Sequence, residues 1–168
     1  MLRVIFDTNI YGLLIEENNI EKINNSLSKD KEFIIYGFKP IRKELRQTSK
    51  TLKLGKIKQR NLLLCTYDEL TKGKTLKFSR EIYSLALNFY KKYREYGGIR
   101  NWKTTNIDVD FIIVACACYY KLDIVISNDT KTMLNPKSLK AYRAIALKEA
   151  LRVPNFWKYN DLKRRYNF

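Results

Sequence analysis

Residues 2–10 of the chain read LRVIFDTNI. The first part, Leu2–Phe6, is mostly apolar and β-prone, which predicts a short strand. The polar turn Asp7-Thr8-Asn9 ends that strand, and a helical pattern begins at Ile10. A strand that passes into a helix within a few residues is typical of α/β proteins.

The same alternation recurs along the chain. Phe33–Tyr36 is a second apolar run, and Pro40 lies in the first turn of a predicted helix that extends to about Thr48. Val109–Tyr120 is apolar almost throughout, and its 12 residues favour a buried helix over a strand. Ile124–Ile126 is short and β-branched, as buried parallel strands are. We therefore expect an α/β fold with a central, mainly parallel β-sheet flanked by helices on both faces.

Other segments give weaker patterns. Phe78, Ile82 and Leu85 recur at helical spacing. We predict helices over Lys56–Cys65, Lys77–Tyr96 and Asn160–Tyr166, a strand over Arg143–Leu147, and a loop over Gly97–Asn106.

Composition restricts the class of protein. A chain of 168 residues that is 45% hydrophobic is long enough for one core, so we expect a single domain over residues 1–168. Its 33 Lys and Arg against 17 Asp and Glu give a formal charge of +16. Such a charge favours a polyanionic partner, and nucleic acid is the first candidate; a solvated basic surface is the alternative.

Several functions are disfavoured by what the sequence lacks. It contains no histidine, which removes Ser/His/Asp and Cys/His catalysis and the usual zinc sites. The cysteines Cys65, Cys116 and Cys118 show no CxxC spacing and are interpreted as structural. No apolar run is long enough to span a membrane, and no signal peptide is apparent, so we expect a cytoplasmic protein without a membrane partner.

Carboxylates remain as the candidate chemical groups. Asp7 and Asp129 each follow a predicted strand, and the carboxyl ends of parallel strands meet at one edge of the sheet. A helix N-cap is the structural alternative for either residue. Glu44 is the single acid between Lys39 and Arg60, a segment with nine Lys or Arg, and it lies beside the apolar stripe of its predicted helix. For Glu44 the alternative is a salt bridge to a nearby lysine.

Two more acids, Asp108 and Asp110, precede the buried helix that begins near Val109. Asp108 is better placed to cap that helix, whereas Asp110 should point toward the mouth of the core. Convergence of Asp7, Glu44, Asp110 and Asp129 would raise their pKa values unless a cation is present. Oxygen ligands without histidine or thiolate suit Mg²⁺ or Mn²⁺, as one or two ions, and phosphodiester hydrolysis is the implied chemistry.

Four segments, in order, resemble the PIN-domain family, named after the PilT N-terminus and including the VapC-type toxins. They are Val4–Asn9, Pro40–Leu45, Asp110–Ala117 and Ile126–Asp129. The resemblance implies a PIN-like fold and a metal-dependent endoribonuclease that acts on RNA. It also implies a frequent homodimer and, for the toxin branch, an antitoxin protein that blocks the cleft.

The resemblance also implies roles for individual residues. Metal is bound by Asp7, Asp110 and Asp129, Glu44 assists directly or through water, and Thr8 or Asn9 and Ser127 support these acids. Asp108 is a further supporting candidate because of its capping position. Three departures from the family pattern are visible: Ser127 stands where Thr is usual, residues 130–132 carry no further acid, and residues 67–105 form a longer region than in compact toxins.

Basic and aromatic residues suggest where RNA would be held. The candidates near the second acid are Lys39, Arg42, Lys43 and Arg46, and those in the glycine-led loop are Arg100 and Trp102. A second basic group, which includes Lys158 and Lys163–Arg165, lies near the carboxyl end.

Two rival functions remain. A catalytically inactive RNA-binding or scaffold module would use the same fold and charge. A haloacid-dehalogenase phosphatase also begins with an acid after its first strand, but it needs a second aspartate where this chain has Asn9.

Overall fold

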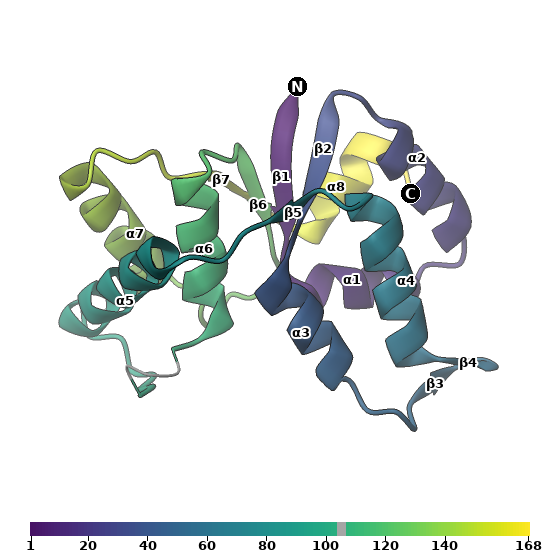
Figure 1. Cartoon of the computed structure of the whole chain (residues 1–168), viewed down its shortest axis with the longest axis horizontal. Coiled ribbons are helices and arrows are strands. Elements are labelled where there is room, and N and C mark those ends of the chain that lie inside the picture. The colour runs from purple at the N-terminus through teal and green to yellow at the C-terminus, as the bar shows by residue number, and fades with distance from the viewer. Residues whose placement is uncertain (104–106) are drawn as a thin grey trace.

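The computed structural model describes residues 1–103 and 107–168, and its centre is a five-stranded parallel sheet (Figure 1). The strand order is β5-β2-β1-β6-β7, and every adjacent pair is parallel. On the central strand, Val4 pairs with Ile35 on one side and with Ile124 on the other. The strands are β1 (Leu2–Phe6), β2 (Phe33–Phe38), β5 (Thr75–Leu76), β6 (Ile124–Ile126) and β7 (Asn155–Trp157).

Helices cover both faces of this sheet (Figure 1). On one side are α1 (Thr8–Ile15), α2 (Ile20–Lys29), α3 (Lys39–Gln47), α4 (Gln59–Thr71) and α8 (Tyr159–Tyr166). On the other are α5 (Arg80–Glu95), α6 (Val109–Tyr119) and α7 (Pro136–Lys148). The expected class, α/β with a central parallel sheet and helices on both faces, is confirmed.

The central elements are the ones with uniformly apolar sequences. Val4, Ile5 and Phe6 of β1 are fully buried, because helices cover both faces of the parallel sheet. In α6 every residue from Phe111 to Cys118 is buried, which explains why this helix is apolar on all sides. The predicted strands at β1, β2 and β6 and the predicted helices at α3, α6 and α8 are confirmed within a few residues.

Two predicted segments are corrected. Arg143–Leu147 is not a strand but part of α7, which begins where Asn135 accepts from the Lys137 N–H and where Pro136 follows. The helix predicted over Lys56–Cys65 starts only at Gln59, because the residues before it form an antiparallel hairpin of β3 (Lys53–Leu54) and β4 (Ile57–Lys58). Gly55 has a φ of +61° in the turn of that hairpin, a conformation that favours glycine.

The helix predicted over Lys77–Tyr96 also begins later than expected. Ser79 caps α5 by accepting a hydrogen bond from the Ile82 N–H, so the helix starts at Arg80. Phe78 therefore precedes the helix instead of continuing its apolar stripe. The predicted loop that follows α5 shows no helix or strand between Gly97 and Lys103, and its residues 104–106 lie outside the described part of the chain.

Parallel strands place their carboxyl ends at one edge of the sheet. β1 ends directly before Asp7, β6 ends directly before Ser127, and β2 passes directly into α3, which carries Glu44. This edge is the location of the candidate site. Within residues 1–103 and 107–168, no helix is sufficiently long and apolar to cross a membrane.

Candidate active site

An open cleft of about 450 Å³ lies at the carboxyl edge of the sheet. It contains the four acids singled out from the sequence, contributed by the end of β1, by α3, by the start of α6 and by the segment after β6. The lining residues are Asp7, Thr8, Asn9, Glu44, Gln47, Asp110 and Asp129. We call this feature the acidic cleft.

Asp7 is held by its neighbours on the cleft floor. Its Oδ1 accepts from the Thr8 backbone N–H at 2.6 Å, so Asp7 does cap α1. Its Oδ2 accepts from Ser127 Oγ at 2.7 Å and from Asn9 Nδ2. Burial, together with the charges of Glu44 and Asp129, raises the pKa of Asp7 to about 6 despite these hydrogen bonds. The capping role and the cleft position therefore belong to the same side chain.

Glu44 reaches the cleft from α3. Thr8 Oγ1 donates to Glu44 Oε2 at 2.5 Å, which joins the start of α1 to the middle of α3. Burial raises the pKa of Glu44, and the nearby charge of Asp108 adds to the effect. Within the described residues Glu44 forms no ion pair, so the salt bridge considered as an alternative is not found.

Asp110 and Asp129 form a carboxyl pair across the cleft. Burial raises the pKa of Asp110 far above its ordinary value; the hydrogen bond with Asp129 and the charges of Asp108 and Asp7 raise it further. Asp129 is also partly buried, but its hydrogen bonds, including the one with Asp110, outweigh burial and lower its pKa. The two carboxyls therefore titrate as a coupled pair, in which Asp110 keeps its proton to higher pH than Asp129.

Local backbone geometry fixes the remaining acids. Asp129 Oδ1 accepts from the Lys131 N–H at 2.7 Å and from the Thr132 N–H at 3.1 Å. Asp108 caps α6, because it accepts from the Asp110 N–H at 3.0 Å. Asp108 thus supports the helix start that carries Asp110, as its position in the sequence indicates.

The chemistry of the cleft suits a hard cation. All its acidic donors are carboxylate oxygens, and burial, with a smaller contribution from neighbouring carboxyls, raises the pKa values of Asp7, Glu44 and Asp110. Across residues 1–103 and 107–168 no three acidic or cysteine side chains are grouped closely enough to form a ready metal-ligand cluster. The donor type therefore fits Mg²⁺ or Mn²⁺, and binding would require the side chains to move inward.

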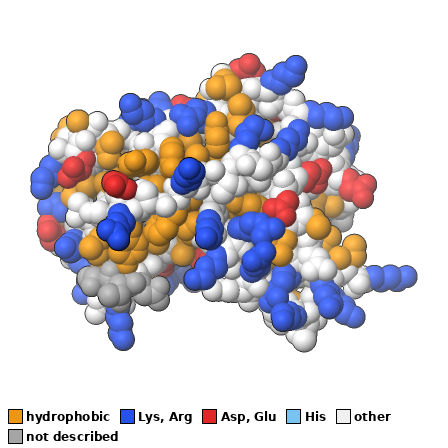
Figure 2. Space-filling model, in the orientation of Figure 1, with side chains coloured by type: hydrophobic (Ala, Val, Ile, Leu, Met, Phe, Trp, Pro, Cys, Tyr) orange, Lys and Arg blue, Asp and Glu red, His pale blue; other side chains and the backbone are white. Residues whose placement is uncertain are grey.

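The basic residues predicted to hold RNA differ in their surroundings. Lys39 and Lys43 are exposed on α3 beside the cleft. Arg42 instead forms a bidentate ion pair with Asp68 of α4, in which Nε and Nη2 lie 3.0 and 2.8 Å from the two carboxylate oxygens. Arg46 is exposed near the same acid. Figure 2 shows Lys and Arg side chains gathered over α3 and over the β3–β4 hairpin.

The two loop candidates differ, because Arg100 is exposed and Trp102 is half-buried. Trp102 packs edge-on against Tyr90 and Phe111, with ring centroids 5.6 and 5.8 Å away. Its ring is thus partly buried against the core, and the role in base stacking stays a prediction. Arg100 lies close enough to Asp108 to lower that carboxyl's pKa, although burial is the larger effect and raises it overall.

The carboxyl-terminal basic group is largely neutralised. Lys163 pairs with Glu17, Arg164 with Asp161, and Arg165 with Asp30. These pairs tie α8 to itself and to neighbouring elements, which leaves α3 as the stronger candidate for phosphate contact.

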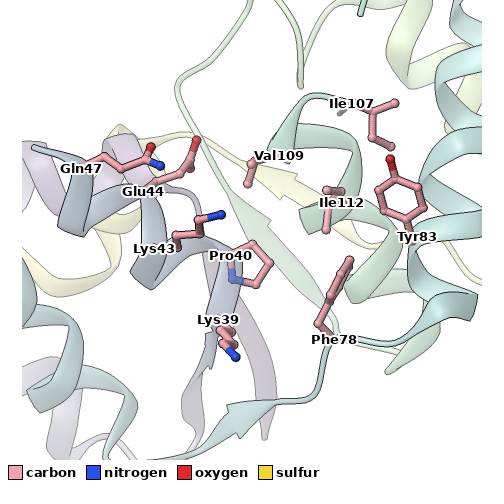
Figure 3. Close-up of a pocket in the computed structure, with 10 residues that line it drawn as sticks. All are labelled: Lys39, Pro40, Lys43, Glu44, Gln47, Phe78, Tyr83, Ile107, Val109 and Ile112. Carbon is pink, nitrogen blue, oxygen red and sulfur yellow. The ribbon is translucent and has the colours of Figure 1, made fainter. Parts of the chain in front are cut away.

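Gln47 is a cleft residue that the sequence interpretation missed. It lies three residues after Glu44 on α3, a spacing that places both on one helix face. The same face continues into a second pocket, between α3 and the start of α6, which Figure 3 shows.

The fold and the site together define an α/β protein with a carboxylate cleft at the carboxyl edge of a parallel sheet. Its sequence matches no protein-family model, and no curated protein matches it significantly.

Proposed function

We propose that this chain is a metal-dependent endoribonuclease of the PIN type, which hydrolyses RNA phosphodiester bonds with Mg²⁺ or Mn²⁺. The observation that supports the proposal is the convergence of Asp7, Glu44, Asp110 and Asp129, from four separate parts of the sequence, in one open cleft. The formal charge of +16 supports a polyanionic substrate, because it offsets the repulsion between phosphate and these acids.

The residues around the acids support catalysis by fixing their positions. Ser127 and Asn9 hold Asp7, Thr8 holds Glu44, and two backbone N–H groups hold Asp129. Asp7, Glu44, Asp110 and Asp129 would hold a divalent ion, which would supply Lewis-acid chemistry for attack of water on phosphorus. One P–O ester bond is replaced by a P–O bond from water, and the leaving oxygen gains a proton. Side chains that are held in advance need less reorganisation during such a step.

The proposal includes the biological setting that the PIN resemblance implies. The protein acts in the cytoplasm as a homodimer, and in the toxin branch an antitoxin protein covers the cleft. These partners are separable from the chemistry, because a nuclease cleft of this kind needs only RNA and the ion.

A direct cleavage assay tests the chemistry. Purified protein is incubated with end-labelled RNA and Mg²⁺, Mn²⁺ or EDTA, alongside Asp7→Asn and Asp129→Asn variants. Glu21→Gln is the matched control, since Glu21 is an exposed acid on α2 and does not line the cleft. We expect cleavage by the wild type and the control only with metal, and none by the two cleft variants.

Cleavage in EDTA, or equal cleavage by all variants, would remove the proposed mechanism. Metal-independent RNA binding without cleavage would instead support the rival function, an inactive RNA-binding module on the same fold.

A further inference from the structure

A second pocket opens directly beside the acidic cleft. It has a volume of about 500 Å³ and lies between α3 and the start of α6 (Figure 3). It shares Glu44 and Gln47 with the acidic cleft, so the two hollows are adjacent along α3. We call it the α3–α6 pocket. A ligand that extends out of the cleft in this direction enters it.

The two walls of the α3–α6 pocket have opposite character. Lys39 and Lys43, four residues apart and therefore on one helix face, lie on the α3 wall. The facing wall is apolar: Ile107 lies just before α6, and Ile112 lies in the first turn of that helix. In Figure 3 the α3 side chains and Ile112 lie across the pocket from one another.

Aromatic side chains complete the apolar wall. Phe78 precedes α5, and Tyr83 lies in its first turns. Phe78 packs edge-on against Phe38 at 5.9 Å and against Tyr83 at 6.3 Å, which holds its ring in place. Even so, 45% of its surface is exposed. A fixed aromatic ring that stays open to solvent is an available surface for stacking.

We infer that the α3–α6 pocket receives an unpaired nucleobase of the strand whose phosphate lies in the acidic cleft. The inference rests on the proposed function and adds to it a base-binding position beside the cleft, with Phe78 as its stacking ring. An aromatic and aliphatic wall accepts the face of any base, while Lys39 and Lys43 offer charges to the adjoining phosphates. A base within a duplex is stacked and paired on both sides and cannot enter such a pocket without leaving the helix.

Charge favours nucleic acid as the occupant over a protein segment. The α3 wall carries lysines next to an acid cluster that is itself suited to a cation, and phosphate is the ligand that both features accept together. Peptide binding is the rival outcome of the experiment below.

The test measures binding separately from cleavage. All variants are made in the Asp7→Asn chain, so that the RNA stays intact. Fluorescence anisotropy in Mg²⁺ measures their affinities for three kinds of RNA: a labelled single strand, its duplex, and a series of single strands with one abasic position each. Phe78→Ala is compared with Phe78→Trp and with Tyr119→Ala. Tyr119 is a matched control because it is 43% exposed and lies at the far end of α6, about 15 Å from Val109 by helix rise.

We expect Phe78→Ala to weaken single-strand binding by about 5- to 150-fold, the usual effect of losing one base-stacking ring. Phe78→Trp and Tyr119→Ala should leave it nearly unchanged. An RNA with an abasic site at one position, the one whose base occupies the pocket, should bind the Asp7→Asn chain more weakly by a similar factor. Adding Phe78→Ala to that chain should not weaken the binding of this RNA further. The duplex should bind more weakly and should not respond to Phe78→Ala.

The base pocket would be overturned if Phe78→Ala weakened binding of the single strand and the duplex equally. It would also be overturned if the loss of affinity caused by Phe78→Ala added in full to the loss caused by every abasic position. The base pocket would also be overturned if Phe78→Ala abolished the binding of an acidic peptide but left the affinity for RNA unchanged. These results leave the nuclease proposal intact, since that proposal depends on cleavage by the Asp7-containing protein. Conversely, base-dependent binding by a protein that never cleaves RNA would remove the nuclease and retain the pocket.

Discussion

Ser127 Oγ donates a 2.7 Å hydrogen bond to Asp7 Oδ2, although 120 positions separate the two residues in the sequence. The same hydroxyl accepts from the Asp129 backbone N–H at 3.0 Å. One small side chain therefore positions two of the acids in the cleft, and it does so from a fully buried position at the end of β6.

Removing this hydroxyl should weaken metal binding more than it weakens the fold. In Ser127→Ala, Asp7 loses a donor and the Asp129 N–H loses its acceptor. We expect about 10- to 100-fold weaker activation by Mn²⁺, as is usual for residues that orient metal ligands, and a loss of about 1 kcal/mol in unfolding free energy. Cleavage rates against Mn²⁺ concentration, together with urea denaturation, measure the two effects.

Ser127→Thr is the conservative control, because threonine keeps the hydroxyl and is the residue usual in the PIN family. Its activation curve should match that of the wild type. Unchanged Mn²⁺ activation in Ser127→Ala would show that this hydrogen bond does not support the ion site.

Divalent metal should stabilise the protein, and neutralising a cleft acid should imitate part of that effect. At a metal concentration of 100 times Kd, binding adds about 2.7 kcal/mol, which for a chain of this size raises Tm by about 5–10 °C. In EDTA, Asp110→Asn should melt above the wild type, since it removes a buried group that resists ionisation. The same variant should lose most of the metal-induced shift.

Differential scanning fluorimetry with Mg²⁺, Mn²⁺ and EDTA makes this comparison. A wild-type Tm that does not respond to either ion, with Asp110→Asn melting lower than the wild type in EDTA, would contradict a cation site at these carboxylates.

The pH dependence of stability has a definite sign in the absence of metal. Asp7 and Asp110 have pKa values raised above their ordinary value of 3.8, so the folded state holds more protons than the unfolded state above about pH 4. The contribution of Asp7 is present at low pH and is lost as pH rises from about 4 through about 6, and that of Asp110 is lost over a range that extends higher. Each such group lowers the unfolding free energy by up to about 1.4 kcal/mol per pH unit in that window.

Other carboxyls act in a separate pH range. Hydrogen bonds from Arg42 and Arg152 lower the pKa values of Asp68 and Asp123, so their stabilisation is present above about pH 4 and is lost only below it. Urea denaturation in EDTA between pH 5 and 8 therefore isolates the cleft acids. We expect the stability gained by Asp7→Asn over the wild type to grow with pH, and a gain that shrinks would contradict the assignment.

Sequence patterns predicted the fold best where burial is uniform along an element. β6, the second half of β1 and residues 111–118 of α6 are buried on all sides, so their composition alone indicated their type. Arg143–Leu147 has three buried or half-buried aliphatic side chains beside the exposed Leu147, and so short a run does not distinguish a strand from one face of α7. The start signal at Asn135 and Pro136 was the information that would have identified the helix.

The candidate site was predictable only in part, for a physical reason. Asp7, Glu44, Asp110 and Asp129 could be singled out because each lies at a strand end, at a helix start or alone in a basic segment. The α3–α6 pocket was not predictable, because Phe78 fits the spacing of the helix that follows it. Only the cap at Ser79 separates Phe78 from that helix and leaves its ring beside the cleft.

Lys39 and Lys43 should supply much of the salt dependence of RNA binding. Each exposed lysine that contacts a phosphate of a single strand adds about 0.7 to the slope of log affinity against log salt concentration. We expect Lys39→Ala and Lys43→Ala each to reduce the slope by about that amount. Arg42→Ala should reduce the slope less, because the bidentate ion pair with Asp68 already neutralises the Arg42 guanidinium.

Lys31→Ala provides the matched control for a lost positive charge. Lys31 is also exposed, but it precedes β2 at the opposite edge of the sheet, away from both the acidic cleft and the α3–α6 pocket. Anisotropy titrations between 50 and about 300 mM salt measure the slopes, a range in which phosphate contacts change affinity strongly. If Lys31→Ala reduced the slope as much as Lys39→Ala, the attraction would come from net charge alone, and α3 would hold no defined phosphate position.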